Sequence, residues 1–393
     1  MRHSPAAGRD TNRNAHAAIA APQFPIVIVR FRLPTLSLSL AYNPQKKHCL
    51  DEGYHYVLAM IVVGAGIIGL ACAWRLARCG IPVTVFDAGA AGGEASWAGA
   101  GMLAPGGEMD EASLLTKMAL CSLAMYPAFV DSLREASGIS IDYQRCGAIE
   151  VALSEAEAES FHIRAARQAG LGIRSEPTHH PMGVARFYPD DALVNPRDIM
   201  AALRIACIRS GVSMHEHDPV VEILGDGAGV RTAHAVHHDD GILLAAGAWS
   251  SDLIPGLPVA KSKPVRGHLI AYRAEAGMLG TILRQGHTYL LQRDTGTLVA
   301  GASTEHVGFD RTIDEHIVGQ IHHRASKLIP ALASMEPAER WNGFRPGIEG
   351  GVPAIGRVEG TRIWTAFGHY RNGILLAPDT ARRIEESVTG ATY

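Results

Sequence analysis

The sequence has few of the cysteine groupings that mark a metal site or a disulfide scaffold. Its 393 residues include six cysteines, and no two of them have CxxC spacing. Such spacing is typical of zinc ligands, and dense cysteines are typical of small secreted domains. We therefore expect no metal and a reducing compartment, the cytoplasm. The nineteen histidines include the pairs His215/His217 and His322/His323. We interpret these as structural or surface residues, because no wider cluster at ligand spacing surrounds them.

An excess of charge of one sign is also lacking. The chain has 36 basic and 39 acidic residues, a formal charge of -3. It therefore lacks the basic footprint of a nucleic-acid-binding protein and a polybasic membrane patch. The apolar segment 24–29 is too short to span a bilayer, and no secretory hydrophobic region precedes it. With 47% hydrophobic and 19% charged residues, the composition is that of a soluble globular protein large enough for two domains.

Residues 1–58 differ from the rest because acids are nearly absent from them. Asp10 is the only acid before Asp51, whereas arginines recur. One interpretation is an amphipathic transit peptide. We favour a disordered extension, because Pro34 and Pro44 would interrupt any helix there.

The most informative stretch is 59–87, AMIVVGAGIIGLACAWRLARCGIPVTVFD. Residues 60–63 are all apolar and predict a buried parallel strand. Gly64, Gly66 and Gly69 follow in the pattern GxGxxG, then a helical pattern to residue 79 and a second strand over 83–86. This is the dinucleotide fingerprint in its required strand–turn–helix–strand context.

Each part of the fingerprint has a physical role. Gly64 makes the tight turn, Gly66 lets the backbone approach a pyrophosphate, and Gly69 lets the helix pack closely on the strand. The pyrophosphate would lie at the positive N-terminus of the helix. Asp87, eighteen residues after Gly69, can accept hydrogen bonds from a ribose. The fingerprint alone does not say which dinucleotide binds.

The remaining patterns predict two kinds of region. Residues 88–105 are nearly all small, which suits either backbone lying on a flat ligand or a flexible surface loop. Asn195 and Pro196 start a helix, and Ser154 starts another with Glu157 three residues later. Helices are predicted over 108–136, 154–169, 195–210, 313–328 and about 372–387. A hairpin over 220–235 and buried strands over 241–247 and 363–367 indicate a nucleotide domain assembled from separated segments. The alternating segments 265–273, 288–293 and 297–303 predict an antiparallel sheet.

We therefore predict a chain of α/β and α+β character. A Rossmann-like βαβ domain comprises 59–143, 194–259 and 343–393, and an antiparallel-sheet substrate domain comprises 144–193 and 260–342. The chain has no second GxGxxG and no CxxxxC, both of which flavin disulfide reductases require. Electrons in an oxidoreductase of this kind would come directly from a substrate.

Three motifs together resemble the D-amino acid oxidase family of flavoproteins. They are the fingerprint, the loop ending AGAGML at 98–103, and the C-terminal FRPG (344–347) with GHYRNGILLAP (368–378). The chain is most similar to the glycine oxidase branch, which serves thiamine biosynthesis. The resemblance runs from residue 60 to the C-terminus and implies a D-amino acid oxidase-like fold with bound FAD. Because no cysteine follows Cys207, we expect this FAD to be non-covalent.

The resemblance implies cofactor-binding residues in five separate stretches of the chain. Besides the three fingerprint glycines, the residues so implied are Ile67, Ile68, Asp87 and Ala88 for the ADP half, Ala95, Ser96, Ala100, Gly101 and Met102 along the flavin, Val220 on the adenine side, and His369, Tyr370, Arg371, Asn372, Gly373, Ile374 and Leu375 around the flavin ring.

The resemblance also implies a substrate site. Arg345 would bind the substrate carboxylate, with Tyr289, Arg371 and Met102 nearby. A guanidinium suits this role because it binds a carboxylate bidentately, and the aromatic residues Trp341 and Phe344 precede Arg345. A surface arginine and a core tyrosine are the plain alternatives. The positive N-terminus of the last helix, near Asn372, would stabilise the charge that develops on the flavin.

The implied activity is oxidation of glycine and other small amines, such as sarcosine and small D-amino acids. Hydride transfer to flavin N5 would give glyoxylate or another 2-oxo acid, ammonia and H2O2, for thiazole synthesis in the thiamine pathway. No general base is assigned. We expect a homotetramer by resemblance. Two other functions stay open. One is a D-amino acid dehydrogenase that passes electrons to a quinone or another carrier, and the other is a module whose flavin is structural.

Overall fold

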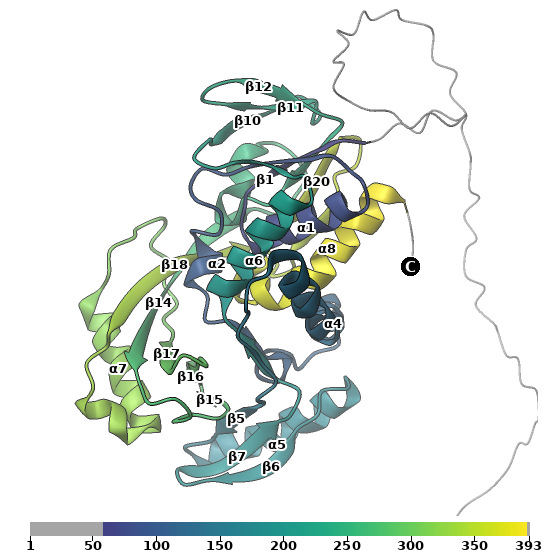
Figure 1. Cartoon of the computed structure of the whole chain (residues 1–393). Coiled ribbons are helices and arrows are strands. Elements are labelled where there is room, and N and C mark those ends of the chain that lie inside the picture. The colour runs from purple at the N-terminus through teal and green to yellow at the C-terminus, as the bar shows by residue number, and fades with distance from the viewer. Residues whose placement is uncertain (1–57, 391–393) are drawn as a thin grey trace, which may run out of the picture. The chain divides into compact units, whose positions relative to one another are not determined.

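The structure is a computed structural model that describes residues 58–390 (Figure 1). The predicted extension comprises residues 1–58, and residues 1–57 of it lie outside the described residues.

A six-stranded sheet carries the glycine fingerprint. Its order is β19-β20-β13-β1-β2-β9. The strands are β1 (Met60–Val63), β2 (Val83–Phe86), β9 (Ser213–His215), β13 (Gly241–Leu244), β19 (Ala354–Arg357) and β20 (Ile363–Phe367). All neighbours are parallel except β19 and β20. The prediction that this sheet is built from separated segments is confirmed.

Alternate residues of β1 belong to two different cores, because successive side chains of a strand point to opposite faces. Met60 and Val62 pack in the larger core and Ile61 and Val63 in another. The larger core includes α1 (Ile67–Arg78), α4 (Leu114–Ser137), α6 (Pro196–Arg209) and α8 (Gly373–Thr389). The other includes residues of β10 (Val220–Leu224), β11 (Gly229–Thr232) and the 3₁₀ helix η1 (Gly247–Leu253). Strand β11 pairs with β10 on one side and with β12 (Val236–His238) on the other.

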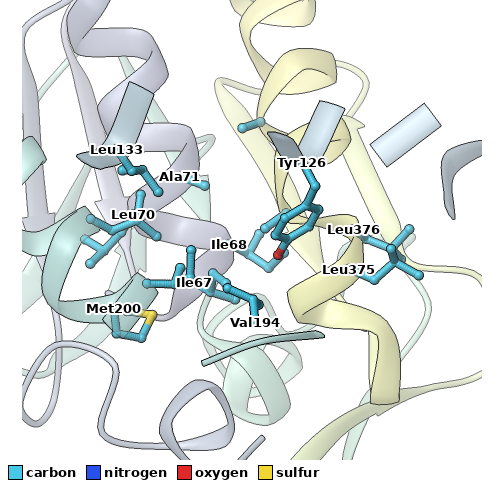
Figure 2. Close-up of a cluster of buried hydrophobic side chains, with 14 of the residues drawn as sticks. Ile67, Ile68, Leu70, Ala71, Tyr126, Leu133, Val194, Met200, Leu375 and Leu376 are labelled. Atoms are coloured by element: carbon cyan, nitrogen blue, oxygen red, sulfur yellow. The ribbon is translucent and has the colours of Figure 1, made fainter. Parts of the chain in front are cut away.

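Figure 2 shows the larger core where three of its helices meet. Leu70 of α1, Leu133 of α4 and Leu376 of α8 are each 0% exposed. Full burial of such a side chain contributes about 1.5–3 kcal/mol, so this core holds the helices firmly on the sheet.

An eight-stranded sheet forms the second region, in the order β18-β14-β17-β16-β15-β5-β7-β6. Its strands are β5 (Ala148–Val151), β6 (Glu176–His180), β7 (Gly183–Tyr188), β14 (Ser262–Arg273), β15 (Ile282–Gln285), β16 (Thr288–Gln292), β17 (Thr297–Gly301) and β18 (Glu339–Ile348). Only β5 and β15 pair in parallel. Helix α7 (Glu315–Leu328) packs against it, followed by η2 (Pro330–Ser334). The predicted antiparallel sheet is confirmed; the predicted domain boundary at 343 falls inside β18 and stays a prediction.

The remaining elements are short strands and helices outside the two large sheets. Three of the strands, β3 (Met102–Leu103), β8 (Ala192–Val194) and β4 (Tyr143–Gln144), form a sheet in the order β3-β8-β4. The helices are α2 (Ala95–Ala98), α3 (Pro105–Glu108), α5 (Glu155–Gly170) and η3 (Tyr370–Asn372).

The predicted helix over 108–136 is wrong at its start. The chain forms the single turn α3, leaves helical geometry at Met109, and starts α4 only after Ser113. The Ser113 side chain accepts a hydrogen bond from the Thr116 N–H at 3.1 Å, which is the N-cap interaction that fixes a helix start. Glu108 therefore lies outside the long helix.

The caps predicted for two other helices are confirmed. Ser154 accepts from the Glu157 N–H at 3.2 Å at the start of α5. Asn195 accepts from the Arg197 N–H at 3.2 Å at the start of α6.

Helix α4 is long and apolar enough to cross a membrane by length and composition alone. It packs against α6 and α8, and Tyr126, Val130 and Leu133 belong to the larger core. A core helix of this kind passes the same test, so the helix by itself is weak evidence for a membrane span.

Candidate active site

A cavity of about 610 Å³ is lined by segments of both large sheets. One part of its wall comes from the carboxyl ends of β1, β2 and β20, where parallel sheets generally bind ligands. Another part comes from β14, β16 and β18. Every predicted site residue lines this cavity except Gly69 and Leu375.

The glycine turn is shaped by close backbone contacts. A Cβ on Gly64, whose φ is +106°, would lie 2.4 Å from the Ala245 O, and one on Gly69 would lie 1.9 Å from the Gly64 O. Neither position accepts a larger residue without a backbone shift. Gly69 thus lies behind the cavity, where α1 packs on the turn.

The N-terminus of α1 receives a polar group from a distant segment. The Ile67 N–H donates to the Ser96 Oγ at 2.9 Å. Ser96 belongs to α2 and also lines the cavity. This contact fixes the small-residue loop against the glycine turn.

Asp87 lies at the end of β2 and is anchored by backbone groups. Its two oxygens accept hydrogen bonds from the N–H groups of Ala65 at 2.6 Å and Gly89 at 2.8 Å. Burial raises the pKa of Asp87, while these two bonds act in the opposite direction. Each carboxylate oxygen keeps a free lone pair for a ribose hydroxyl. Ala88 and Val220 line the same end of the cavity.

The loop through Ala100, Gly101 and Met102 is held by a buried arginine. Arg293 donates from Nη1 to the Val194 O at 2.8 Å and from Nη2 to the Ala100 O. A Cβ on Gly101 would lie 1.9 Å from the same Val194 O. Ala95 lines the cavity from the neighbouring helix α2.

Residues 369–374 form another part of the cavity wall. His369 is 3% exposed and its Nε2 lies 3.0 Å from the Thr380 Oγ1. Burial lowers the pKa of His369 to about 3, so this imidazole is neutral near pH 7. Tyr370 has a φ of +51°, which costs a non-glycine residue free energy and marks a constrained backbone. Leu375 is a core residue of α8.

The N-terminus of α8 points its first residues at the cavity. Asn372 is the N-cap but makes no side-chain capping bond, and Gly373 and Ile374 line the cavity. The Tyr126 hydroxyl donates to the Ile374 O at 2.6 Å and fixes this first turn. The helix can therefore direct its partial positive charge at a ligand.

Arg345 lies in β18, opposite Val265 of β14. A Cβ on Gly267 would lie 2.1 Å from the Arg345 Nη1, so this glycine makes room for the guanidinium. The Nη1 donates to the Ser303 O at 3.0 Å. The preceding residue, Phe344, is 1% exposed, and Arg345 itself is partly buried.

A buried network supports the Ser303 carbonyl. Glu305 accepts from the Ser303 hydroxyl at 2.6 Å and from Arg266 at 2.6 Å, and its Oε1 lies 2.8 Å from the His268 Nδ1. These contacts hold the pKa of Glu305 below its usual range, although burial opposes them. The network fixes the segment to which Arg345 is bonded.

Tyr289 and Arg371 line the cavity together with Arg345 and Met102. Burial raises the pKa of Tyr289, and the guanidinium groups of Arg345 and Arg371 oppose that rise. Arg371 forms an ion pair with Glu108, with 2.7 Å between Nη2 and Oε1. The structure thus brings all four predicted substrate residues into one cavity, with Tyr289 close enough to both arginines to feel their charge.

Glu108 is a functional candidate that the sequence analysis missed. The predicted long helix absorbed it as an ordinary helical residue. The available signal was its position directly after the small-residue loop, in LAPGGE (103–108). Trp249, Ser303 and Arg311 also line the cavity and carried no sequence signal.

Comparison with known proteins agrees with this geometry. The family described as DAO, FAD dependent oxidoreductase, matches residues 60–387. This chain belongs to that family. A glycine oxidase from Pseudomonas aeruginosa is 33% identical over 354 residues, covering 84% of this chain and 94% of that protein. The crystal structure of glycine oxidase from Geobacillus kaustophilus matches with a TM-score of 0.81 at 30% identity, covering 86% of this chain and 96% of that one.

A third relative is a fusion. The bifunctional protein ThiO/ThiG from Synechocystis sp. is 32% identical over 345 residues, which cover 84% of this chain and 51% of that protein. The predictions of the family, of the fold and of an FAD-dependent oxidoreductase are confirmed.

The cavity of this DAO family member fits FAD. The glycine turn leaves the Asp87 end free of bulky side chains, and that carboxylate keeps acceptors for a ribose. The uncapped start of α8 offers N–H groups at the other end. No cysteine occurs among the described residues that line the cavity. Non-covalent binding therefore stays our prediction.

Proposed function

We propose that this protein catalyses the oxidative deamination of glycine and of other small amines, including sarcosine and small D-amino acids. For glycine, one molecule each of glycine, O2 and water would give glyoxylate, ammonia and H2O2. The observation that carries the proposal is the position of Arg345 in the cavity, next to Tyr289 and residues 369–374. The glycine oxidases among the relatives support it.

Arg345 would bind and orient the substrate carboxylate. The Nη1 of Arg345 donates to the neutral carbonyl oxygen of Ser303. The positive charge of Arg345 and its remaining N–H groups are therefore available to an anion. The Tyr289 hydroxyl can donate a further hydrogen bond, because burial keeps this tyrosine protonated. Two fixed contacts on one carboxylate orient a small substrate with few other handles.

FAD, when bound, would supply the hydride acceptor and pass the electrons to O2. The chain's part in that chemistry is electrostatic. The uncapped N-terminus of α8 places partial positive charge at the cavity, where negative charge would develop. His369 stays neutral near pH 7 and is bonded to Thr380, so it serves as a structural residue rather than a base. The substrate amine would enter the reaction neutral.

The second candidate is a D-amino acid dehydrogenase that passes electrons to a quinone or another carrier. The same cavity serves both reactions, because they differ only in the electron acceptor. We favour the oxidase because the relatives at 30% identity or more include glycine oxidases.

We also propose that the product serves thiazole synthesis. The support is the Synechocystis relative named ThiO/ThiG, in which a region similar to this chain is joined to a further region. A homotetramer and a cytoplasmic location are likewise proposals that rest on the resemblance.

The test is to purify the full chain and record its flavin spectrum. Anaerobic glycine, sarcosine, D-alanine and D-proline should each be tried for flavin bleaching, and then for H2O2 in air. A colourless protein, or a flavin that none of these amines bleaches, would contradict the proposal. Bleaching with dye reduction but little H2O2 would identify the dehydrogenase instead.

A further inference from the structure

Two arginines line the substrate end of the cavity, and their charges are balanced differently. Arg371 is paired with the Glu108 carboxylate at 2.7 Å. Arg345 donates to the neutral Ser303 carbonyl at 3.0 Å, and no carboxylate of residues 58–390 forms an ion pair with it. Two guanidinium groups and one carboxylate leave a single uncompensated positive charge, at Arg345.

Glu108 is held in place by buried polar contacts around α3. The Gly106 N–H donates to Asp191 at 3.1 Å. Gln168 Nε2 donates to the carbonyl oxygens of Gly106 and Met109, both at 2.8 Å. These three contacts flank Glu108 on both sides, so its backbone is fixed beside the cavity.

A buried arginine lies directly behind the same turn. Arg284 is paired with Asp191 at 2.7 Å, and a Cβ on Gly107 would lie 2.6 Å from the Arg284 Cζ. Gly107 therefore lets the Arg284 guanidinium pack against the backbone next to Glu108. The Glu108–Arg371 pair is thus a built part of the cavity wall, with only 16% of the Glu108 side chain exposed.

We propose that Glu108 is a specificity-determining residue that excludes amines carrying a second carboxylate. This inference rests on the proposed function and names its substrate class as monocarboxylate amines. A substrate with one carboxylate and a neutral amine matches the single free charge of Arg345. A second carboxylate would lie close to the Glu108 carboxylate. The Arg371 charge is already balanced by Glu108, so the second carboxylate would have no cation to pair with. Two like charges in contact without a further cation are strongly disfavoured.

Sarcosine and iminodiacetate form a matched pair of probes. Both are secondary amines with the same reacting CH2–COO⁻ group. The second substituent on the nitrogen is a methyl group in sarcosine and another carboxymethyl group in iminodiacetate. Oxidation of iminodiacetate with O2 and water would give glyoxylate, glycine and H2O2, so peroxide measures both reactions. The wild-type holoenzyme is expected to prefer sarcosine by at least about tenfold in kcat/KM, on the order expected for one unfavourable charge contact.

The decisive variant is Glu108→Gln, which keeps the shape of the side chain and removes its charge. It frees Arg371 for the second carboxylate, so the kcat/KM of iminodiacetate relative to sarcosine should rise at least about tenfold. The double variant Glu108→Gln/Arg371→Gln should lose this gain. Glu315→Gln, which removes an exposed carboxylate paired with Arg340 at 2.7 Å, is the matched control and should leave the ratio unchanged.

An unchanged ratio in a Glu108→Gln enzyme that still binds FAD and oxidises sarcosine would overturn the proposal. A gain that persists in the double variant would also overturn it, because the gain would not depend on Arg371.

A second measurement needs no variant and no turnover. Methoxyacetate and oxydiacetate are unreactive ethers with the shapes of the two substrates, and each can be titrated into the wild-type holoenzyme while the flavin absorbance is followed. Methoxyacetate should bind at least about ten times more tightly. Equal or tighter binding of oxydiacetate would overturn the role of Glu108. Absence of glycine and sarcosine turnover would instead contradict the proposed function and leave this titration interpretable.

Discussion

The two ends of the cavity are built in different ways. At the Asp87 end, the shape comes from backbone atoms in close contact, such as Gly64 against Ala245 and Gly69 against Gly64. At the Arg345 end, it comes from charged side chains held by buried networks, such as Arg266–Glu305 and Arg284–Asp191. Substitutions at the first end should therefore act on FAD binding, and substitutions at the second should act on substrate.

The largest effect is expected from Arg345→Ala. Loss of the only unpaired guanidinium among the described substrate-end residues should lower kcat/KM for glycine about 100-fold or more, because truncating one partner of a buried charge contact costs several kcal/mol. The flavin absorbance per protein should stay at the wild-type level. Arg340→Ala changes an exposed arginine of the same strand and serves as the control. If Arg345→Ala loses FAD, the arginine is structural and the comparison between the two ends fails.

The next effect is at the other end, in Gly69→Ala. The added Cβ would need to displace the Gly64 carbonyl, and overpacking of this kind costs about 1–3 kcal/mol. The Kd for FAD, measured by flavin fluorescence during titration of the apoprotein, should rise about 10–100-fold. In Gly319→Ala of α7 no atom lies within 4 Å of the added Cβ, so FAD binding should be unchanged. Unaltered FAD affinity in Gly69→Ala would mean that the turn adapts.

A smaller change is expected from Asp87→Asn. The amide keeps one acceptor but places an NH2 group toward the Ala65 or Gly89 N–H, so one of the two backbone bonds is lost. FAD affinity should fall about tenfold, the effect of about 1.4 kcal/mol. The kcat of the FAD-saturated variant should match the wild type, and a large loss of kcat would contradict the separation of the two ends.

The smallest effect concerns His369, where the pKa is lowered to about 3 by burial. An unfolded histidine has a pKa near 6.5, so between these values the unfolded chain binds more protons. The free energy of unfolding should therefore fall as the pH drops below about 6.5, by about 1 kcal/mol per pH unit from this group. His369→Gln should remove that part of the slope, measured by denaturant unfolding of the holoenzyme at pH 5.5 and 7. His306→Gln, at an exposed position, should keep the slope; the same slope in His369→Gln would contradict the assignment.

The Asp87 end could be predicted from the sequence because it is local. The strand, turn, helix and acid that form it lie within residues 60–87, and the structure reproduces their bounds. The order of the sheet could not be predicted from these residues, since β1 pairs with β13, which is remote in the sequence. Arg345, Tyr289 and Arg371 could be named only from the family resemblance.

Residues whose role depends on a distant partner gave no signal. Trp97 is the one large aromatic residue in the small-residue loop 88–105, and the sequence offers no reason for it. In the structure the Arg197 guanidinium lies 3.8 Å from its ring centroid, and Trp341 packs edge-on against it, so it joins α2 to α6 and β18. For Glu108 the sequence offered only its position after the small-residue loop, and its pairing could not be predicted because its partner Arg371 follows β20, far along the chain. The periodicity of hydrophobic residues indicates which side chains are buried, but it does not indicate which charged residues far apart in the sequence form ion pairs.

The position of β20 has a consequence for biosynthesis. This strand lies inside the six-stranded sheet, between β13 and β19, and η3 and then α8 follow it in the chain. On a ribosome, the glycine turn emerges long before these elements exist. Because residues 369–374 line the cavity, its wall is incomplete until residue 374 has been made, and a nascent chain that stalls before β20 lacks the strand that pairs with β13. By this topology, a complete cavity for FAD requires that translation has passed both β20 and the start of α8.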